Sequence, residues 1–428
     1  MQNNEIPKGY KNSPLGIIPE EWMVKRLGDC CILSSGGTPS KNNPEYWDGS
    51  IPWISAISMH EQYIYDSEYT ITESGLKQGS KLAKQGDLLL LVRGSMLWSK
   101  IPICFCERDV AFNQDVKGIA VKKIATSIFL LYWFLSNEHK LLNDVVGTGI
   151  GAGKLETESL IKTHVLLPPL PEQQKIAEIL TCWDDAIEKR TRLIEKLEIR
   201  KRGLMQQLLT GKKRLMGFEG RWKEVKLGEI GDTYNGLTGK RKEDFGKGKP
   251  YIPYLNIFNN SKVDTTFFDY VEIGIDENQN RVRHGDIFFT VSSETPDEVG
   301  MASVLMNDIA ELYLNSFCFG YRLYNFDILL PEFSCYYLRS EIFRQEISKL
   351  SQGATRFNLS KNNLMKLIAV LPPIEEQIAI ANILSTADNE VQKEKEKLMA
   401  LKAQKKGLMQ QLLTGKTRVK YKTKKECS

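Results

Sequence analysis

The segment GTGIGAGK at residues 147–154 is the part of the sequence that comes nearest to a catalytic motif. A nucleotide-binding P-loop needs glycine at position 148 and serine or threonine at position 155, where this chain has Thr148 and Leu155. The segment also fits a loose G-x-G-x-x-A pattern, but it follows a predicted helix and not a strand, which is the wrong context for binding dinucleotide phosphates. The corresponding segment later in the chain, SQGATRFN at 351–358, keeps a single glycine of the series. A flexible or substrate-contacting loop is therefore the favoured interpretation.

Two proline-containing segments, LPPL at 167–170 and LPPI at 371–374, share their central prolines with the (D/N)PP(Y/F) motif of amino-methyltransferases. That motif needs a polar first residue to hold the target amino group and an aromatic fourth residue to stack on the flipped base, and both are missing here. We find no Ser/His/Asp set, no carboxylate and lysine cluster of a metal-dependent nuclease, and no ligand spacing among the eight cysteines and four histidines. The sequence therefore predicts neither catalytic nor metal-binding residues in this chain.

Several loops, in contrast, combine glycine with basic, amide, hydroxyl and aromatic side chains. Lysine and arginine suit phosphates, whereas asparagine, serine and tyrosine can hydrogen-bond to base edges, asparagine suiting adenine. Each loop taken alone is more typical of a solvated surface, but the loops recur at equivalent positions of both halves, which favours DNA binding. The candidate DNA-binding residues of the first half are Gly37, Thr38, Ser40, Lys41, Trp53, Ser55, Ser58, Arg93, Ser95 and Lys154. Those of the second half are Thr238, Lys240, Arg241, Lys242, Tyr254, Asn256, Asn259, Asn260, Ser292, Ser293, Thr295, Arg356 and Asn358.

These loops belong to a chain of 428 residues that consists of two copies of one unit of about 200 residues. The decapeptide GLMQQLLTGK at 203–212 returns unchanged at 407–416. At the same offset of 204, 20 of the 41 positions from Glu172 to Lys212 are identical to their partners. Nearer the start of each copy the offset relaxes to 200, where Trp22 corresponds to Trp222. Each copy thus has a variable front and a preserved back.

The preserved back has the pattern of a long helix. Apolar residues recur at alternating spacings of four and three from Ile176 to Leu208, and again from Ile380 to Leu412, which is a heptad seam. About 39 residues at 1.5 Å per residue give a rod of roughly 58 Å. Because such a narrow seam is marginal in an isolated helix, we expect the two helices to pair with each other. An antiparallel pairing is the easier connection, since a globular domain lies between them; burial in two separate cores is the alternative.

The variable fronts have a mixed pattern. Short β-prone runs such as 87–92 and 286–291 alternate with turn residues, and one helix is predicted late in each unit, at 126–146 and 331–350. The predicted fold class is α+β, with two similar α/β domains separated by two long antiparallel coiled-coil helices in an internal pseudo-twofold repeat. The predicted boundaries are 1–166 and 216–370 for the two α/β domains, 167–215 and 371–416 for the helical spacers, and 417–428 for a basic C-terminal tail.

The net charge of +5 does not by itself indicate nucleic-acid binding, because residues 416–428 carry an excess of +5 and the rest of the chain sums to zero. Such basic tails are usually solvated. The longest apolar run, at 128–135, is far shorter than the roughly 20 residues that span a bilayer. The first residues lack the apolar segment of a signal peptide. We therefore expect a cytoplasmic protein without a membrane partner.

The complete pattern resembles the specificity (S) subunit of type I restriction–modification systems. The resemblance covers essentially the whole chain and is carried by the two repeated helical blocks and by GIIPEEWMVKRLGD, RWKEVKLGEIGD and SETPDEVGMASV at 16–29, 221–232 and 293–304. It implies two target-recognition domains that each read one half of an interrupted, asymmetric double-stranded DNA site, with the two long helices holding them apart. A coiled-coil adaptor that joins two protein-binding domains without nucleic acid is the alternative.

The resemblance also implies the partners. The S subunit of the family has no catalytic centre and assembles with two modification subunits, which bind S-adenosylmethionine and methylate adenine. It also assembles with restriction subunits, which use ATP to translocate and cut DNA. S-adenosylmethionine, ATP and Mg²⁺ therefore belong to partner subunits, and this chain is expected to bind no cofactor.

The repeated decapeptide contains more identities than a heptad seam requires. The seam explains its leucines, but a glycine inside a helix costs about 1 kcal/mol, and nothing in the seam requires identical glutamines. We predict a second, outward surface that meets two copies of one partner, the modification subunit. The candidate partner-binding residues are Gly203, Gln206, Gln207, Lys212, Gly407, Gln410, Gln411 and Lys416.

Overall fold

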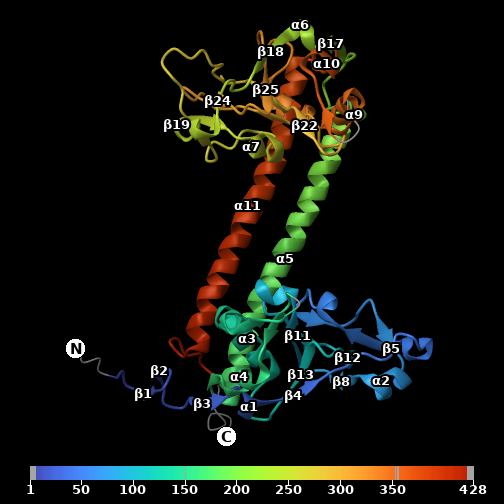
Figure 1. Cartoon of the computed structure of the whole chain (residues 1–428). Coiled ribbons are helices and arrows are strands. Elements are labelled where there is room, and N and C mark those ends of the chain that lie inside the picture. The colour runs from blue at the N-terminus through green and yellow to red at the C-terminus, as the bar shows by residue number, and fades with distance from the viewer. Residues whose placement is uncertain (1–5, 150, 352, 354–355, 422–428) are drawn as a thin grey trace. The chain divides into compact units, whose positions relative to one another are not determined.

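The computed structural model describes residues 6–149, 151–351, 353 and 356–421. The chain divides into two compact units (Figure 1). Unit 1 comprises Met1–Thr191 together with Lys397–Ser428, and unit 2 comprises Arg192–Glu396. Head 1 denotes the part of unit 1 that precedes the first long helix, and head 2 the part of unit 2 that lies between the two long helices. Each unit therefore contains one head and one portion of each long helix.

The two long helices are α5, Leu170–Leu208, and α11, Ile374–Leu413. In unit 2 they are joined by ion pairs of Glu198 with Lys395, of Arg200 with Glu390 and of Lys201 with Asp388. Partner numbers fall along α11 as they rise along α5, so the helices run antiparallel in this unit. The predicted antiparallel pairing is confirmed, and α5 and α11 lie inside the predicted spacers 167–215 and 371–416.

Each hydrophobic core receives the beginning of one long helix and the end of the other. The core of unit 1 includes Ile176 and Leu180 of α5 together with Leu412 and Leu413 of α11. The main core of unit 2 includes Leu208, the last residue of α5, and the following Leu209, together with Ile380 and Leu384 of α11. The ends of both helices are thus buried in a head, and each head is held by both helices.

Head 1 is built on two sheets, as the α+β prediction required. The strand order of the larger sheet is β4-β13-β9-β11-β6, and that of the smaller sheet is β7-β5-β12-β8. The strands of the larger sheet are Cys31–Ser35, Val116–Val121, Leu88–Leu91, Ile103–Cys106 and Tyr63–Ile64. Those of the smaller sheet are Thr70–Ile71, Trp47–Ile54, Val110–Phe112 and Lys81–Ala83.

The described strands of head 2 follow the same order, with one strand fewer in each sheet. Its larger sheet has the order β18-β25-β21-β23, with strands Gly231–Asn235, Cys318–Leu323, Ile287–Thr290 and Ala302–Val304. Its smaller sheet has the order β20-β19-β24, with strands Asp269–Val271, Phe245–Ile252 and Tyr313–Leu314. Short two-stranded sheets pair β3, Met23–Arg26, with β16, His164–Leu167, and β17, Lys223–Lys226, with β27, Ile368–Leu371.

The helix late in each head differs between the copies. Head 1 has one continuous helix, α3, Ser127–Asn143. Head 2 has two helices in its place, α8, Pro331–Tyr337, and α9, Glu341–Leu350, so the prediction of a single helix at 331–350 was wrong. Ser340 forms the N-cap of α9, because its side chain accepts a hydrogen bond from the backbone of Phe343, and such a cap stabilises a new helix start.

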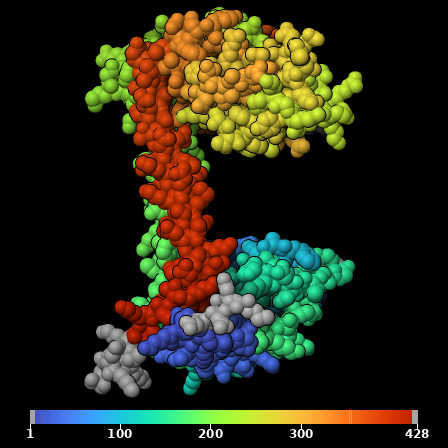
Figure 2. Space-filling model, turned by 90° about the vertical axis from the view of Figure 1, so that its left-hand side faces the viewer, coloured from blue at the N-terminus to red at the C-terminus, as the bar shows by residue number. Residues whose placement is uncertain are grey.

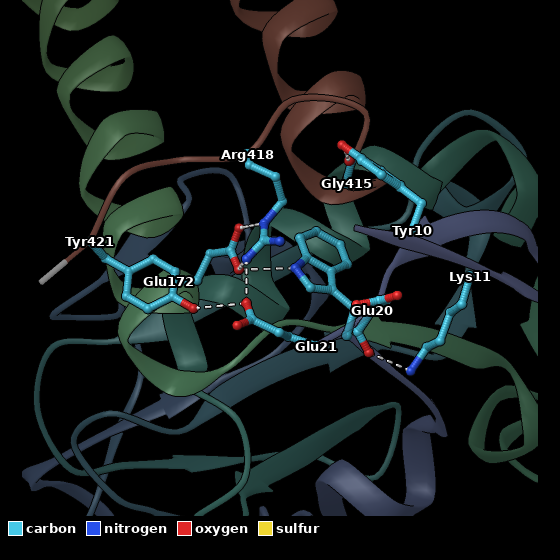
Figure 3. A network of polar contacts seen from close by, with 9 residues as sticks. Tyr10, Lys11, Glu20, Glu21, Glu172, Gly415, Arg418 and Tyr421 are labelled. Atoms are coloured by element: carbon cyan, nitrogen blue, oxygen red, sulfur yellow. Dashed lines mark hydrogen bonds and ion pairs between the residues drawn. The ribbon is translucent and has the colours of Figure 1, made fainter. Parts of the chain in front are cut away.

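A buried glutamate lies at the start of each long helix. In unit 1, Glu172 is fully buried and accepts hydrogen bonds from Nε and Nη2 of Arg418 at 2.6 and 2.9 Å, and from Nε1 of Trp22 at 3.0 Å (Figure 3). In unit 2, Glu376 accepts the same set from Arg214, at 2.7 and 2.7 Å, and from Trp222 at 3.2 Å. In each unit the arginine follows the end of the other long helix, so one carboxylate joins both helices to the head.

The glutamine that follows each glutamate is also buried, and its side chain hydrogen-bonds the start of the long helix to the head. Gln173 donates to the carbonyls of Ile124 and Pro168 and accepts from the backbone of Thr126, at 2.8 to 3.0 Å. Gln377 makes the same three contacts, with Ile328, Pro372 and Leu330, at 2.7 to 3.0 Å. The repeated Glu-Gln pair therefore fixes the start of each long helix to its head.

The basic tail was expected to be solvated. Its described residues instead contact other parts of unit 1. The hydrogen bond from Arg418 is the main cause that lowers the pKa of Glu21, and Tyr421 donates to the same carboxylate at 3.2 Å. Tyr10 donates to the carbonyl of Gly415 at 3.2 Å, and Figure 2 shows the end of α11 against residues near the N-terminus of this unit. Residues 422–428 of the predicted tail lie outside the described residues.

Among the described residues, no helix is both long enough and apolar enough to cross a membrane.

Replacing Arg418 by methionine is expected to lower the free energy of unfolding by about 1–3 kcal/mol, because it leaves the buried carboxylate of Glu172 without its cation. The lower end reflects the exposure of Arg418, whose side chain is 30% accessible. The measurement is urea unfolding followed by far-UV circular dichroism. Lys420→Met removes one positive charge from the same segment and should change stability by less than about 0.5 kcal/mol. Equal effects of the two substitutions would contradict the role assigned to Arg418.

Candidate nucleic-acid interface

The loop after β4 in head 1 is held by two indole groups. Nε1 of Trp47 donates to the carbonyl of Ser40 at 3.1 Å, and Nε1 of Trp53 donates to the carbonyl of Gly37 at 3.0 Å. The two rings pack edge to face, 5.3 Å apart. Trp53 is buried and its polar atom is occupied, so it positions the predicted DNA-binding loop and does not itself present a hydrogen-bonding group.

This loop passes very close to neighbouring backbone. A Cβ atom on Gly36 would lie 2.1 Å from the carbonyl oxygen of Phe112, and one on Gly37 would lie 2.1 Å from that of Gly79. Glycine is therefore required at both positions by close approach. In head 2, a Cβ on Gly236 would lie equally close to the carbonyl of Asn315. The same loop is thus packed in the same way in both heads.

A cavity of 670 Å³ opens beside this loop in head 1. Four predicted residues line it, namely Thr38, Lys41, Trp53 and Ser55. Gln114 also lines it, and the hydroxyl of Thr38 donates to Oε1 of Gln114 at 2.7 Å. The sequence analysis missed Gln114, because an isolated glutamine before a strand carries no pattern. Ser58 is engaged elsewhere, since its hydroxyl lies 2.9 Å from that of Ser67.

A second group of predicted residues in head 1 is assembled by strand pairing. β10, Arg93–Gly94, pairs with β15, Gly153–Leu155, so that Arg93 lies opposite Lys154. Ser95, which follows β10, is exposed. Two loops that are about 60 residues apart in the sequence thus lie side by side. Ile150, inside the glycine-rich segment that contains Lys154, lies outside the described residues.

Lys117 connects the two groups of head 1. Its ammonium group donates to the hydroxyl of Ser35, directly before the glycine loop. Burial lowers the pKa of Lys117, and the positive charges of Arg93 and Lys81 lower it further. Arg93 and Lys81 are therefore each close enough to Lys117 to repel its charge. A phosphate group would relieve this repulsion, because an anion near the cations favours their charged forms.

Head 2 brings the equivalent loops together. β22, Ser292–Ser293, pairs with β26, Phe357–Asn358, and Ser292 lies opposite Asn358. The hydroxyl of Tyr254 donates to the carbonyl of Ser292 at 3.3 Å. Burial raises the pKa of Tyr254, whereas the positive charge of Arg356 lowers it, so the side chain of Arg356 lies near the same place. Four of the predicted residues are thereby gathered at one position of head 2.

Several predicted residues of head 2 remain available to a ligand. Arg241, Lys242 and Asn259 are exposed. Thr238 is exposed as well, although its backbone exchanges hydrogen bonds of 3.1 and 2.8 Å with the side-chain amide of Gln279. Gln279 is a second glutamine that the sequence analysis did not identify.

Two predictions for head 2 need correction, because the side chains concerned are consumed within the fold. Asn256 is fully buried and bonds to Asp264 and Phe267, so its amide cannot reach a base edge. Lys240 is an almost buried partner of Glu277, so it is not free to bind phosphate.

Three further predicted residues of head 2 bond to near neighbours. Ser293 and Thr295 both donate to Glu298, at 3.2 and 2.9 Å. Asn260 donates to the carbonyl of Asn256 at 3.0 Å. These side chains shape their loops, and the structure does not present them as free hydrogen-bonding groups.

The repeated decapeptide lines an equivalent groove in each unit. In unit 1 a groove of 820 Å³ is lined by Gly407, Gln410, Gln411 and Lys416 together with residues of α3. In unit 2 a groove of 590 Å³ is lined by Gly203 and Gln206 together with residues between α8 and α9. Ser136 and Ser340, which correspond at the offset of 204, line the two grooves from the heads.

The predicted partner-binding side chains are accessible in both copies. Gln206, Gln207, Gln410 and Gln411 are exposed, as are Lys212 and Lys416. A Cβ atom added to Gly203 or Gly407 would meet no described atom within 4 Å. The described part of the chain therefore gives no steric reason for either glycine.

Comparison with known protein families identifies the repeated unit. The model of the type I restriction modification DNA specificity domain matches residues 19–198 and again residues 219–403. The chain belongs to this family. Each match contains one head and most of the long helix that follows it, so the family's domain corresponds to one copy of the repeat.

Individual family members match over nearly the full length. The chain is 30% identical over 421 residues to the type I restriction enzyme MjaVIII specificity subunit of Methanocaldococcus jannaschii. The matched region covers 94% of each of the two proteins. The fold is similar to that of the type I restriction–modification S subunit from M. genitalium, with a TM-score of 0.53, 16% identity and coverage of 92% and 96%. A structure from a study of complex assembly and conformational transition of the type I system gives a TM-score of 0.61 at 20% identity, with coverage of 94% and 99%.

Within the described residues of this family member, no group of three or more His, Cys, Asp or Glu side chains is placed to hold a metal ion.

Asn256→Ala is expected to destabilise the chain by on the order of 2 kcal/mol, because it leaves buried carbonyl and amide groups without partners. Asn259→Ala removes the same side chain from the exposed face of the same helix, α7, Tyr254–Asn259, and should change stability by less than about 0.5 kcal/mol. Thermal unfolding of both variants measures the difference. A silent Asn256→Ala would show that the amide has no structural role.

Proposed function

We propose that this chain is the DNA sequence-specificity subunit of a type I restriction–modification complex, and that each head reads one half of a bipartite, asymmetric site. One observation carries the proposal. The same two-residue strand pairing joins distant loops in both heads, opposing Arg93 to Lys154 in head 1 and Ser292 to Asn358 in head 2. Because base recognition depends on side-chain identity, one construction with different side chains suits two different half-sites.

The chain acts by recognition and performs no reaction of its own. S-adenosylmethionine, ATP and Mg²⁺ belong to the modification and restriction subunits, which methylate adenine and translocate and cut DNA. Two modification subunits dock in the two grooves lined by the repeated decapeptide. The long helices set the distance between the half-sites.

Binding of DNA by the isolated chain should be weak. Phosphate contacts dominate the affinity of DNA-binding proteins, and here the positive charge is concentrated at the C-terminus while the rest of the chain is close to neutral. In head 1 the cations Arg93 and Lys117 supply local phosphate contacts. The modification subunits are expected to complete the clamp around the duplex.

The proposal is tested by selecting bound duplexes from a random pool with the chain and its modification subunits. We expect an enriched motif of two unlike half-sites separated by a spacer of fixed length. Removing one heptad at facing positions of both helices, 191–197 and 392–398, shortens the pair by about 10 Å. At 3.4 Å per base pair, the spacer should become shorter by about three base pairs.

The half-sites themselves should not change in this deletion variant, because both heads are intact. Altered half-sites with an unchanged spacer would contradict the proposal. Enrichment of no sequence by the wild-type complex would favour a coiled-coil adaptor that joins protein-binding heads.

The docking proposal is tested with Gly203→Ala and Gly407→Ala. Alanine has a higher helix propensity by about 1 kcal/mol, and a Cβ at these positions meets no described atom, so each variant should be at least as stable as the wild type. Binding of the modification subunit, measured by calorimetry, should weaken about tenfold per site, because the methyl group prevents close approach of the partner.

Gln404→Ala, at an exposed position of α11 outside the groove lining, serves as the control and should bind normally. Glycine variants that bind two modification subunits with wild-type affinity would show that the grooves are not the docking sites. Substitution of Gln206 and Gln410 should reproduce the loss of affinity without a gain in stability.

A further inference from the structure

Arg339 is a largely buried arginine in the break between α8 and α9 of head 2. Its Nε donates to the carbonyl of Ala302 at 2.6 Å. Its Nη2 donates to the carbonyls of Ile257, Phe258 and Asn260, at 2.5, 3.0 and 2.8 Å. The last three carbonyls lie at the C-terminal end of α7. A cation is favourable there, because the unpaired carbonyls of a helix C-terminus carry partial negative charge.

Burying the charged guanidinium of Arg339 is electrostatically unfavourable. The pKa of Arg339 is lowered to about 10, mainly by burial and in addition by the charge of Arg344. In the described part of the chain Arg339 forms no ion pair, and every hydrogen bond recorded for its guanidinium goes to a main-chain carbonyl. A buried charge without a counter-charge is costly unless its donors are satisfied in a fixed geometry. The guanidinium therefore fixes the position of α7.

The other end of α7 lies at the candidate DNA-binding surface. Tyr254 is its first residue, and the ring of Tyr254 stacks on that of Phe258, with the centroids 5.8 Å apart. The hydroxyl of Tyr254 donates to Ser292, where β22 pairs with β26. Displacement of the C-terminal end of a six-residue helix is transmitted to its first residue. The position of Tyr254 thus depends on Arg339.

Arg339 also faces the docking groove. It lines the groove of 590 Å³ together with Gly203 and Gln206 of α5 and with Thr210 just beyond that helix, and its neighbours Ser340 and Glu341 line the same groove. One side chain therefore contacts both the groove beside the decapeptide and the helix that carries Tyr254.

The corresponding part of head 1 is built differently. Leu135 occupies the position of Arg339 at the offset of 204, and α3 continues through it without a break. In place of α7, head 1 has one short turn of 3₁₀-helix, η2, Ala56–Ser58. The arginine, the break and α7 occur together in one copy, so the repeat itself does not require them.

We propose that Arg339 is a positioning residue that couples occupation of the groove beside Gly203 to base discrimination by head 2, acting through α7. The inference rests on the proposed function, in which a modification subunit occupies this groove. The docked subunit holds the segment 339–341 in place, and Arg339 then holds α7 and Tyr254 in the geometry that reads DNA. Head 1 has Leu135 at this position, so docking of a modification subunit does not increase its base discrimination in this way.

The test compares Arg339→Leu, which installs the residue of head 1, with Glu332→Gln, which alters an exposed residue of α8 that does not line the groove. Competition binding measures how strongly a base-pair change in each half-site weakens binding of the selected duplex. Each protein is assayed alone and with saturating modification subunit. A photoreactive amino acid at the exposed Phe317 identifies the half-site that head 2 contacts.

For the wild type we expect the modification subunit to increase discrimination at the half-site of head 2. Arg339→Leu should abolish this increase, a loss of about tenfold, and leave the half-site of head 1 unchanged. Glu332→Gln should behave as the wild type. Arg339→Lys keeps the charge but cannot reach all four carbonyls, so it should lose part of the increase and provides the test if Arg339→Leu does not fold.

Discrimination by Arg339→Leu that still rises on docking would overturn the inference and leave the proposed function intact. Equal losses with and without the modification subunit would reduce Arg339 to a structural residue and also overturn it. A wild-type complex with no sequence preference would overturn the proposed function itself, and the inference with it.

Discussion

The buried carboxylates of Glu172 and Glu376 are the interactions on which the arrangement of each unit depends. A fully desolvated carboxylate is tolerated only where its acceptors are satisfied, and here a bidentate arginine and a tryptophan indole satisfy them. The three groups come from three separate segments: the start of one long helix, the residues beyond the end of the other, and the strand region that opens the head. The same charge therefore anchors both helices to the head in each unit.

The two networks contain the same contacts, but the chain connects the arginine to the tryptophan in only one of them. In unit 2 the chain runs directly from the end of α5 through Arg214 to Trp222. In unit 1 the matching arginine, Arg418, follows the end of α11, whereas the matching tryptophan, Trp22, is close to the N-terminus. Contacts such as the hydrogen bond from Tyr10 to Gly415 take the place of the covalent link. Gly415, Arg418 and Tyr421 thus contact a folded head, which the basic composition of this segment does not indicate.

Much of the fold could be predicted because its signals are local or repeated. The heptad seam and the offset of 204 were sufficient to predict the long helices and their pairing. Lys201 and Lys405 interrupt the heptad seam, and the sequence alone does not explain them, because their partners come from the other helix. Lys405 pairs with Asp184, and Lys201 pairs with Asp388. Those aspartates also accept hydrogen bonds from Tyr132 and Tyr336 of the heads. Such links between distant segments leave no pattern in the sequence.

The candidate site was predictable to a smaller extent, for the same reason. Loop composition predicted Thr38, Ser292 and Asn358, which stay candidates, but composition cannot distinguish an exposed amide from one that closes a turn, as Asn256 does. Nor can it reveal that Lys240 is neutralised by Glu277, nearly forty residues later. Gln114 and Lys117 were missed because each is a single polar residue beside a strand. Their importance arises from the strand pairing that brings β4 and β13 together.

The repeated glycines separate two kinds of constraint on this chain. Where a glycine is required by the fold, as at Gly36, the neighbouring atoms that would collide with a side chain are present in the same head. At Gly203 and Gly407 the described chain leaves open space, yet both helices accept the cost of a glycine in their interior. A constraint that acts on both copies equally, and has no source among the described atoms, points to a surface that closely approaches another molecule. The loops of the two heads share a backbone arrangement but not their side chains. Their sequences need not be identical, so the two copies can differ there.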